Sequence, residues 1–262
     1  MTGDRENSPD VVPSAAHDGA GNRRRVLILL VFTACVLFVF MVQECREAME
    51  AWRRADCSAN PKQFGLVCKM FAIDNEEHLY PPLSSKPGKL MLEKESVFSV
   101  FPEYLTNPWI FACPSVHIDR KLREHPESFI DDQCFFYLGY AVTGETDMAG
   151  FCAAYKDHIA KGIPFDDDLK VLTGQGSLGG ETIYRLRDGI ELVFAAGLGN
   201  PAAANVWRSK IPVLIERPEN HMLDGGNVLF LDGHVEFLRY PGSWPMTEKT
   251  IAALEELDAM GR

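Results

Sequence analysis

The pattern of hydrophobic and polar residues near the start of the chain is typical of a membrane span. Residues 26–42 are seventeen uncharged, apolar residues with no polar face, and Arg23, Arg24 and Arg25 precede them. Seventeen residues of α-helix measure about 25 Å, the short end of what crosses a bilayer. The pattern predicts a transmembrane helix over residues 23–43 that contacts the lipid bilayer through residues 26–42.

The next stretch keeps a helical period but has only one apolar face. Its apolar residues recur at i, i+3, i+4, i+7 and i+8, namely Phe64, Val67, Cys68, Phe71 and Ala72. We expect a stalk helix over residues 44–82, with a kink near Pro61 because proline has no N–H for the helical ladder. Such a stripe needs a surface to bury it.

Shorter elements follow in residues 83–262. We expect a helix over residues 145–162 that Gly162 ends, and two hairpins, around Asp188-Gly189 and Asp232-Gly233. The remaining predicted elements are strands within 109–115, 133–142 and 211–216, a helix that Asn200 and Pro201 begin, and a last helix over 247–260. Because hairpins require an antiparallel sheet, we expect an α+β domain in which the long helix packs on a small antiparallel sheet.

The last hairpin has one wholly apolar face. A two-residue turn at Asp232-Gly233 would pair Phe230 with Val235 and Val228 with Phe237. That face is expected to lie on the core. Leu229 with Glu236, and Leu231 with His234, would then form the more open face.

The net charge of -11 makes nucleic acid an unfavourable partner.

The distribution of charge indicates which side of the membrane each part of the chain occupies. Residues 1–22 are polar and predict a disordered tail. Because basic residues favour the cytoplasmic side, we expect a single-pass inner-membrane protein with a cytoplasmic N-terminus and an extracytoplasmic domain.

Six of the seven cysteines follow the apolar run, in a compartment where disulfides persist. Fifteen connectivities are open to six cysteines. Cys113 with Cys134 is a candidate disulfide, whereas Cys68 on the apolar stripe is at least as well explained as a buried thiol. No CxxC pair is present, which disfavours a structural zinc site.

The last hairpin also carries candidate metal ligands. His221, Asp224, Asp232 and His234 could hold a divalent metal with a position open for water. Turn chemistry already explains Asp232 and Gly233, and no HExxH accompanies them, so we expect neither catalytic residues nor a metal. Bound Ca²⁺ stays open as an alternative, although the densest carboxylate run, residues 165–170, lacks alternating ligands.

Three blocks resemble a known family. "CSANPKQFGLVCKMFAIDNEEHLYPPLS", "FACPS" and "ERPENHMLDGGNVLFLDGHVEF" occur in the order seen in bacterial pseudopilin-like proteins with a C-terminal H-x9-DG motif. These proteins are related to the major pseudopilins of type II secretion. The resemblance implies a pilin-like fold and a non-catalytic assembly role, with other pseudopilin-like subunits or envelope proteins as partners. In this chain ten residues separate His221 from Asp232-Gly233.

The N-terminal signature of the family is not matched. Asn22 follows Gly21, and no Glu lies between residues 26 and 42. Three functions therefore stay open. The chain could be a component or relative of a secretion pseudopilus, a non-polymerising envelope protein of the same fold, or a metal-dependent hydrolase that uses the last hairpin.

Overall fold

The computed structural model describes residues 19–90, 104–116, 133–221 and 225–261. The chain divides into two compact units, Met1–Glu50 and Ala51–Arg262. Helix α1 (Gly19–Asp74) belongs to both. The other elements are η1 (Pro108–Phe111), β1 (Phe135–Tyr137), α4 (Glu145–Lys161), β2 (Leu169–Lys170), η3 (Ser177–Gly179), β3 (Thr182–Ile183), α5 (Ile190–Gly197), η4 (Pro201–Ala203), α6 (Ala204–Arg208), β4 (Pro212–Glu216), η5 (Pro218–His221), β5 (Gly225–Phe230), β6 (Val235–Arg239), α7 (Glu248–Asp258) and η6 (Ala259–Gly261).

In the first unit, the described residues 19–50 are all helical. The helix is long and apolar enough to cross a membrane, and the side chains of residues 26–42 are exposed. The predicted disordered tail is wrong for residues 19–22, because a helix propagates at little cost from an established run into its neighbours. Residues 1–18 lie outside the described part of the chain.

In the second unit, the final turns of α1 bury one stripe. Cys57, Phe64, Cys68 and Ala72 are fully buried on it. The helix continues through Pro61 without interruption, and the expected kink there stays a prediction. Burial of the stripe on both sides of Pro61 outweighs the one backbone hydrogen bond that proline cannot donate.

Asn75 ends α1 earlier than the expected residue 82. Its Nδ2 donates to the carbonyl of Phe71 at 2.8 Å, and its Oδ1 accepts from the N–H of Leu79 at 2.8 Å. The side chain thus satisfies one of the last helical carbonyls and turns the backbone away. The prolines are not needed to stop the helix.

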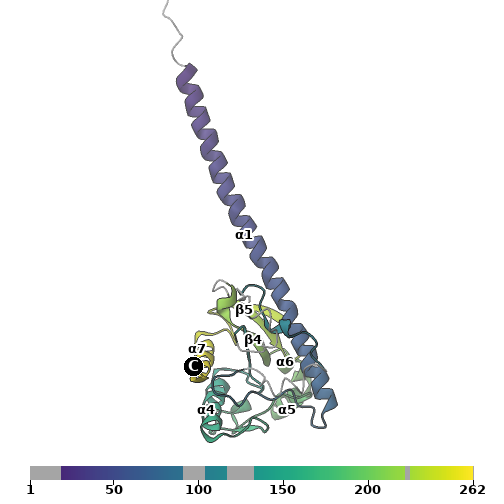
Figure 1. The fold of residues 1–262 in the computed structure, drawn as a ribbon. Helices are drawn as coiled ribbons and strands as arrows, with labels where there is room; N and C mark the ends of the chain where they lie inside the picture. The colour runs from purple at the N-terminus through teal and green to yellow at the C-terminus, as the bar shows by residue number, and fades with distance from the viewer. Residues whose placement is uncertain (1–18, 91–103, 117–132, 222–224, 262) are drawn as a thin grey trace, which may run out of the picture. The chain divides into compact units, whose positions relative to one another are not determined.

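A four-stranded antiparallel sheet with the order β1-β4-β5-β6 is the surface on which this part of α1 packs (Figure 1). Contact is close at Gly65, where an added Cβ would lie 3.2 Å from a methyl group of Leu229 on β5. β5 is central and every residue in it is buried. The prediction of an α+β domain with a long helix on a small antiparallel sheet is therefore confirmed.

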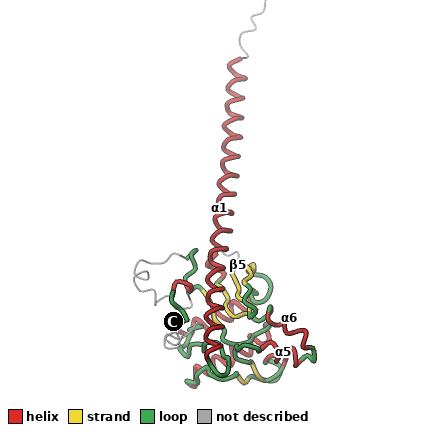
Figure 2. Tube along the Cα trace, turned by 90° about the vertical axis from the view of Figure 1, so that its right-hand side faces the viewer, coloured by secondary structure: helices red, strands yellow, loops and turns green. Residues whose placement is uncertain are grey.

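Within the second unit, the sheet lies between α1 and α7 (Figure 1), and Figure 2 shows the strands behind the lower end of α1. Ile251, Leu254 and Leu257 of α7 are buried. Two ion pairs join α4 to α7, and Lys156 to Glu256 is one of them at 2.5 Å. The core is formed by the sheet and the helices on its two sides.

Several sequence predictions are confirmed at residue level. α4 ends at Lys161, and Gly162 follows in the left-handed conformation with φ of 65°. Asn200 accepts a hydrogen bond from the N–H of Ala202 and begins η4, which α6 follows. The predicted strand 211–216 is β4.

Two predicted β elements are 3₁₀ or α helices instead. Residues 108–111 form η1, and residues 190–197 form α5 in place of the second strand of a hairpin at Asp188-Gly189. Ile190 and Phe194, spaced i and i+4, are both fully buried. Burial of a helical face in the core has outweighed the β propensity of this run.

The last hairpin exists, but its register is one residue away from the prediction. Val228 pairs with Glu236 and Leu229 with Val235. The N–H of Gly233 donates to the carbonyl of Phe230, and Gly233 has φ of 89°, as in a three-residue turn with a bulge. Val228 and Phe230 are buried as expected, whereas Val235 and Phe237 on the edge strand are only partly buried.

Candidate metal centre

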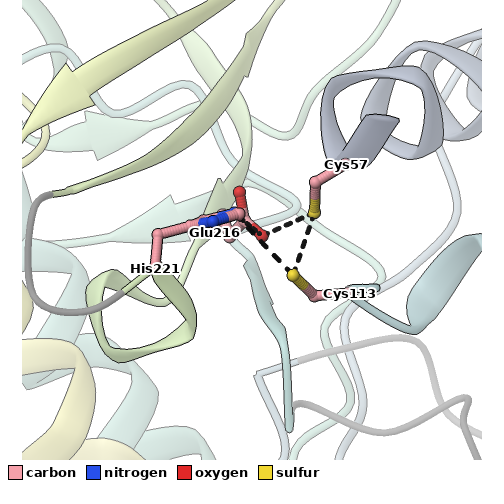
Figure 3. A group of neighbouring side chains, drawn as sticks. All are labelled: Cys57, Cys113, Glu216 and His221. Atoms are coloured by element: carbon pink, nitrogen blue, oxygen red, sulfur yellow. Dashed lines mark hydrogen bonds and ion pairs between the residues drawn. The ribbon is translucent and has the colours of Figure 1, made fainter. Parts of the chain in front are cut away.

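Four side chains from distant parts of the sequence meet inside the second unit (Figure 3). They are Cys57, Cys113, Glu216 and His221, here called the CCEH cluster. Their four ligand atoms all lie within 4.8 Å of one another. Each of the four residues has 0% of its surface exposed. The CCEH cluster is therefore enclosed by protein.

Cys57 occupies the position one heptad before Phe64 on the buried stripe of α1. Its Sγ lies 2.7 Å from Oε1 of Glu216 and 3.1 Å from Sγ of Cys113. A thiol carries a single proton, so Cys57 can donate to only one of these neighbours at a time. The buried stripe of α1 thus places Sγ of Cys57 beside the last residue of β4.

Cys113 lies just after η1, and two contacts hold its backbone. Nδ2 of Asn60 on α1 donates to the carbonyl of Ala112 at 2.9 Å. The N–H of Cys113 donates to Sγ of Cys134 at 3.3 Å. These contacts hold the turn against both α1 and the residue that precedes β1.

Glu216 is the last residue of β4, and its carboxylate is held from one side. Oε2 accepts from the backbone N–H of Asn227 at 2.9 Å and from Nδ2 of Asn227 at 2.8 Å. Gly226 permits this approach, because an added Cβ there would lie 2.7 Å from the carbonyl oxygen of Glu216. Oε1 consequently faces the two thiols and the imidazole.

His221 ends η5 and is held in a similar way. Its Nδ1 lies 3.3 Å from Oγ of Ser115, and its Nε2 lies 3.1 Å from Oε1 of Glu216 and 3.8 Å from Sγ of Cys113. When Nδ1 donates its proton to Ser115, Nε2 presents a lone pair to the cluster. Nε2 is then the nitrogen that could bind a metal.

The electrostatics of the CCEH cluster favour an anionic Cys113 sulfur beside a cationic imidazole, while the hydrogen bond to Cys113 and burial raise the pKa of Cys57. The hydrogen bond from Cys57 lowers the pKa of Cys113 to about 7. Burial lowers the pKa of His221, but its hydrogen bonds with Cys113 and Glu216 outweigh burial and raise the value to about 10. Burial opposes ionisation of Glu216, yet the neighbouring His221 and Asn227 hold its pKa below the ordinary value.

The donor set is one that a transition metal prefers. Two thiols, one imidazole and one carboxylate are the ligand types found at tetrahedral Zn²⁺ sites. Among the described residues, this is the one group of three or more His, Cys, Asp or Glu side chains close enough to share an ion. All four residues are fully buried within the part of the chain that the structure describes.

The candidate metal ligands named from the sequence, where no bound metal is expected, are not brought together. His221 belongs to the CCEH cluster, while Asp232 and His234 lie at the hairpin turn and form an ion pair of 2.5 Å with each other. Both of these side chains are about a third exposed, at 31% and 39%. Asp224 lies outside the described residues. A shared site of His221, Asp232 and His234 is therefore not formed, because the turn holds the last two by local hydrogen bonds.

The other candidates are also placed. The candidate Cys113–Cys134 disulfide is not formed in this structure, since both cysteines are free and Cys134 accepts a backbone hydrogen bond. In the acidic run 165–170, Asp168 forms an ion pair with Arg187 at 3.0 Å. That carboxylate is thereby engaged in a contact with an arginine.

Sequence reasoning missed Cys57 and Glu216 as site residues. Cys57 is one heptad before Phe64 and eleven residues before Cys68, so extending the apolar stripe backwards would have placed it on the buried face. Glu216 ends a wholly buried strand, and a carboxylate in such a place needs partners. The heptad spacing of Cys57 and the carboxylate at the end of a buried strand were the sequence signals that could have identified these two site residues.

Comparison of the chain with models of known protein families, with characterised proteins and with solved structures found no match.

Proposed function

We propose that the chain is a single-pass inner-membrane protein whose extracytoplasmic domain has a pilin-like fold. In this proposal it acts through protein contacts, as a structural component or relative of a type II secretion pseudopilus, and it is not an enzyme. The apolar residues 26–42 contact the lipid bilayer, and the N-terminus lies in the cytoplasm.

The observation that carries the proposal is the composition of α1. One helix contains an uncharged apolar run with exposed side chains and, further along, a stripe that is buried in the second unit. An apolar surface on every side of a helix is stable in lipid and unfavourable in water. One helix thus forms the membrane anchor and also contributes its final turns to the core of the domain, as in the pilin-like proteins that the sequence resembles.

The order of elements also supports a pilin-like interpretation. A long N-terminal helix packs on an antiparallel sheet, and the hairpin of β5 and β6 carries Asp232-Gly233 at its turn. His221 precedes this hairpin, as the resemblance implies. A role in protein contacts fits a domain whose described polar cluster is closed to solvent.

A non-polymerising envelope protein of the same fold is the second candidate. It is favoured by the absence of a Glu between residues 26 and 42, together with Asn22 after Gly21. The family signature for processing and packing into filaments is therefore lacking. The anchor and the domain would be unchanged, and only self-assembly would be lost.

Membrane topology is the test of the shared proposal. Full-length protein should remain in the membrane pellet after carbonate extraction, and protease added to spheroplasts should cleave residues beyond 43. The proposal would be contradicted by protein recovered in the soluble cytosol. It would also be contradicted if residues beyond 43 were protected from protease added to spheroplasts.

The two candidates are separated by the mature N-terminus and by self-association. Mass spectrometry of an intact N-terminus and absence of cross-linked multimers in cells would select the non-polymerising protein. A shortened N-terminus with cross-linked multimers would select the assembling subunit.

A further inference from the structure

We infer that the CCEH cluster binds one Zn²⁺ as a closed structural site. The ion would join α1 to the turn after η1, to the end of β4 and to the end of η5. This inference concerns the second unit alone and does not depend on the proposed role in secretion.

The first reason is the chemical identity and direction of the four donors. Sulfur from Cys57 and Cys113, oxygen from Glu216 and nitrogen from His221 face one another (Figure 3). Zinc takes such ligands in tetrahedral sites, and four protein ligands without an open position characterise structural rather than catalytic sites. Three widely separated stretches supply the ligands, with Glu216 and His221 only five residues apart in one of them, so the fold brings the two cysteines to this local pair.

The second reason is that residues outside the CCEH cluster hold the outward-facing atoms of the carboxylate and the imidazole. Asn227 holds Oε2 of Glu216 through two hydrogen bonds, and Ser115 lies against Nδ1 of His221. Metal-binding carboxylates and histidines are typically held by such outer contacts, which fix the tautomer and leave the binding atom free to face the metal. Here the inward atoms are Oε1 and Nε2.

The third reason is distance. Zinc bonds of about 2.0–2.3 Å at tetrahedral angles place ligand atoms about 3.3–3.8 Å apart. Four of the six separations between these atoms are 2.7, 3.1, 3.1 and 3.8 Å, and the other two are at most 4.8 Å. Side-chain movements of about 1 Å convert this arrangement into a zinc shell.

A disulfide between Cys57 and Cys113 is the competing outcome for the same sulfur atoms. Their separation of 3.1 Å would have to shrink by about 1 Å to reach a bonded length, but grow by only about 0.7 Å to fit zinc. A disulfide would also leave unexplained why Oε1 of Glu216 and Nε2 of His221 are directed at the sulfurs. Zinc accounts for all four side chains.

Zinc binding changes the protonation and the net charge of the CCEH cluster. Zinc binding releases the protons of the two thiols, and that of Nε2 when His221 is charged, to solvent. Two thiolates, one carboxylate and neutral imidazole around Zn²⁺ leave one net negative charge. The N–H groups of Asn227 that donate to Glu216 lie where they stabilise it.

The test is metal content and thiol state of the same preparation. Full-length protein is purified in mild detergent without added metal or chelator, and zinc per chain is measured by mass spectrometry. A second portion is denatured with chelator and an alkylating agent, and the peptides that carry Cys57 and Cys113 are analysed. We expect about one zinc per chain and alkylation of both cysteines.

A matched pair of variants assigns the metal to the cluster. Cys57→Ala removes a ligand, whereas Cys68→Ala removes another fully buried thiol from the same stripe of α1. We expect zinc content to fall at least tenfold in Cys57→Ala and to stay near one in Cys68→Ala. Zinc retained by Cys57→Ala would overturn the inference.

A spectroscopic measurement does not depend on whether a variant folds. In wild-type protein, exchange of zinc for Co²⁺ should produce the intense visible bands of tetrahedral cobalt and thiolate-to-metal charge transfer in the near ultraviolet. Protein without metal, with Cys57 and Cys113 either linked in a disulfide or both free, would overturn the inference. So would Co²⁺ spectra without thiolate charge transfer.

Discussion

The two parts of α1 differ in how they meet their surroundings, although they belong to one helix. Residues 26–42 are apolar on all sides and exposed, whereas residues 51–74 bury a narrow stripe and place charged residues elsewhere. Helix geometry is the same in both, so only the distribution of side chains differs. The comparison teaches that the surrounding medium of a helix can be read from its pattern of polar positions rather than from its length.

The largest effect is expected from charge placed in the apolar run. Leu30→Lys combined with Leu37→Lys should cost about 5–7 kcal/mol of membrane insertion, since each lysine near the middle of a span costs about 2.5–3.5 kcal/mol. We expect the double variant to leave the membrane pellet or to be degraded, as measured by fractionation and immunoblotting.

The control places the same charges in the other part of the helix. Leu66 and Ile73 are 61% and 66% exposed, so Leu66→Lys with Ile73→Lys should keep the protein in the membrane. Equal loss from the membrane in both double variants would remove the proposed distinction between the two parts.

A smaller effect is expected from a cavity beneath the second part. Phe64 is fully buried and meets the rings of Phe111 and Tyr137 at centroid distances of 5.4 and 5.5 Å. Phe64→Ala should lower the free energy of unfolding by about 3–5 kcal/mol, by loss of buried area and creation of a cavity. Urea titration with pulse proteolysis of the full chain in detergent would measure it.

Phe38→Ala is the matched control for this cavity. Phe38 is 61% exposed in the structure and lies in the apolar run. We expect the unfolding of residues 51–262 to be unchanged in this variant. A similar destabilisation by both substitutions would show that the apolar run contributes to the domain core.

The smallest effect is expected from removing a charge in the second part. Lys69 forms an ion pair with Asp188, and both side chains are 32% exposed. Lys69→Gln should lower the free energy of unfolding by less than about 1 kcal/mol, because solvent screens such pairs. The pairwise contribution follows from a double-mutant cycle with Asp188→Asn, measured in low and high salt, and should shrink in high salt.

Periodicity predicted the fold where one face of an element decides its environment. The stripe of α1, the helix α4 with Gly162 after it, and strand β4 followed from local patterns. The run 190–197 did not, because β-rich residues bury a helical face when the core offers one. The hairpin register was missed by one residue, since a three-residue turn and a two-residue turn use the same Asp232-Gly233 signal.

The candidate site could be predicted only in pieces. His221 and Cys113 stood out as reactive residue types in short motifs, whereas Glu216 looked like the end of a strand. Their meeting depends on β4 lying between β1 and β5 and on the stripe of α1 covering β5. Contacts between segments so far apart leave no spacing pattern in the sequence, so the absence of CxxC says nothing about a site built in this way.

The wide separation of the CCEH residues along the chain sets an order of events during synthesis. Glu216 is 159 residues after Cys57, so at 5–20 residues per second roughly 10–30 s pass between the two. During that interval neither Glu216 nor His221 is available to Cys57, and its sulfur is not yet enclosed by the sheet. Completion of β4 and η5 closes that interval, and the same sulfur is then hidden from solvent for the lifetime of the folded domain.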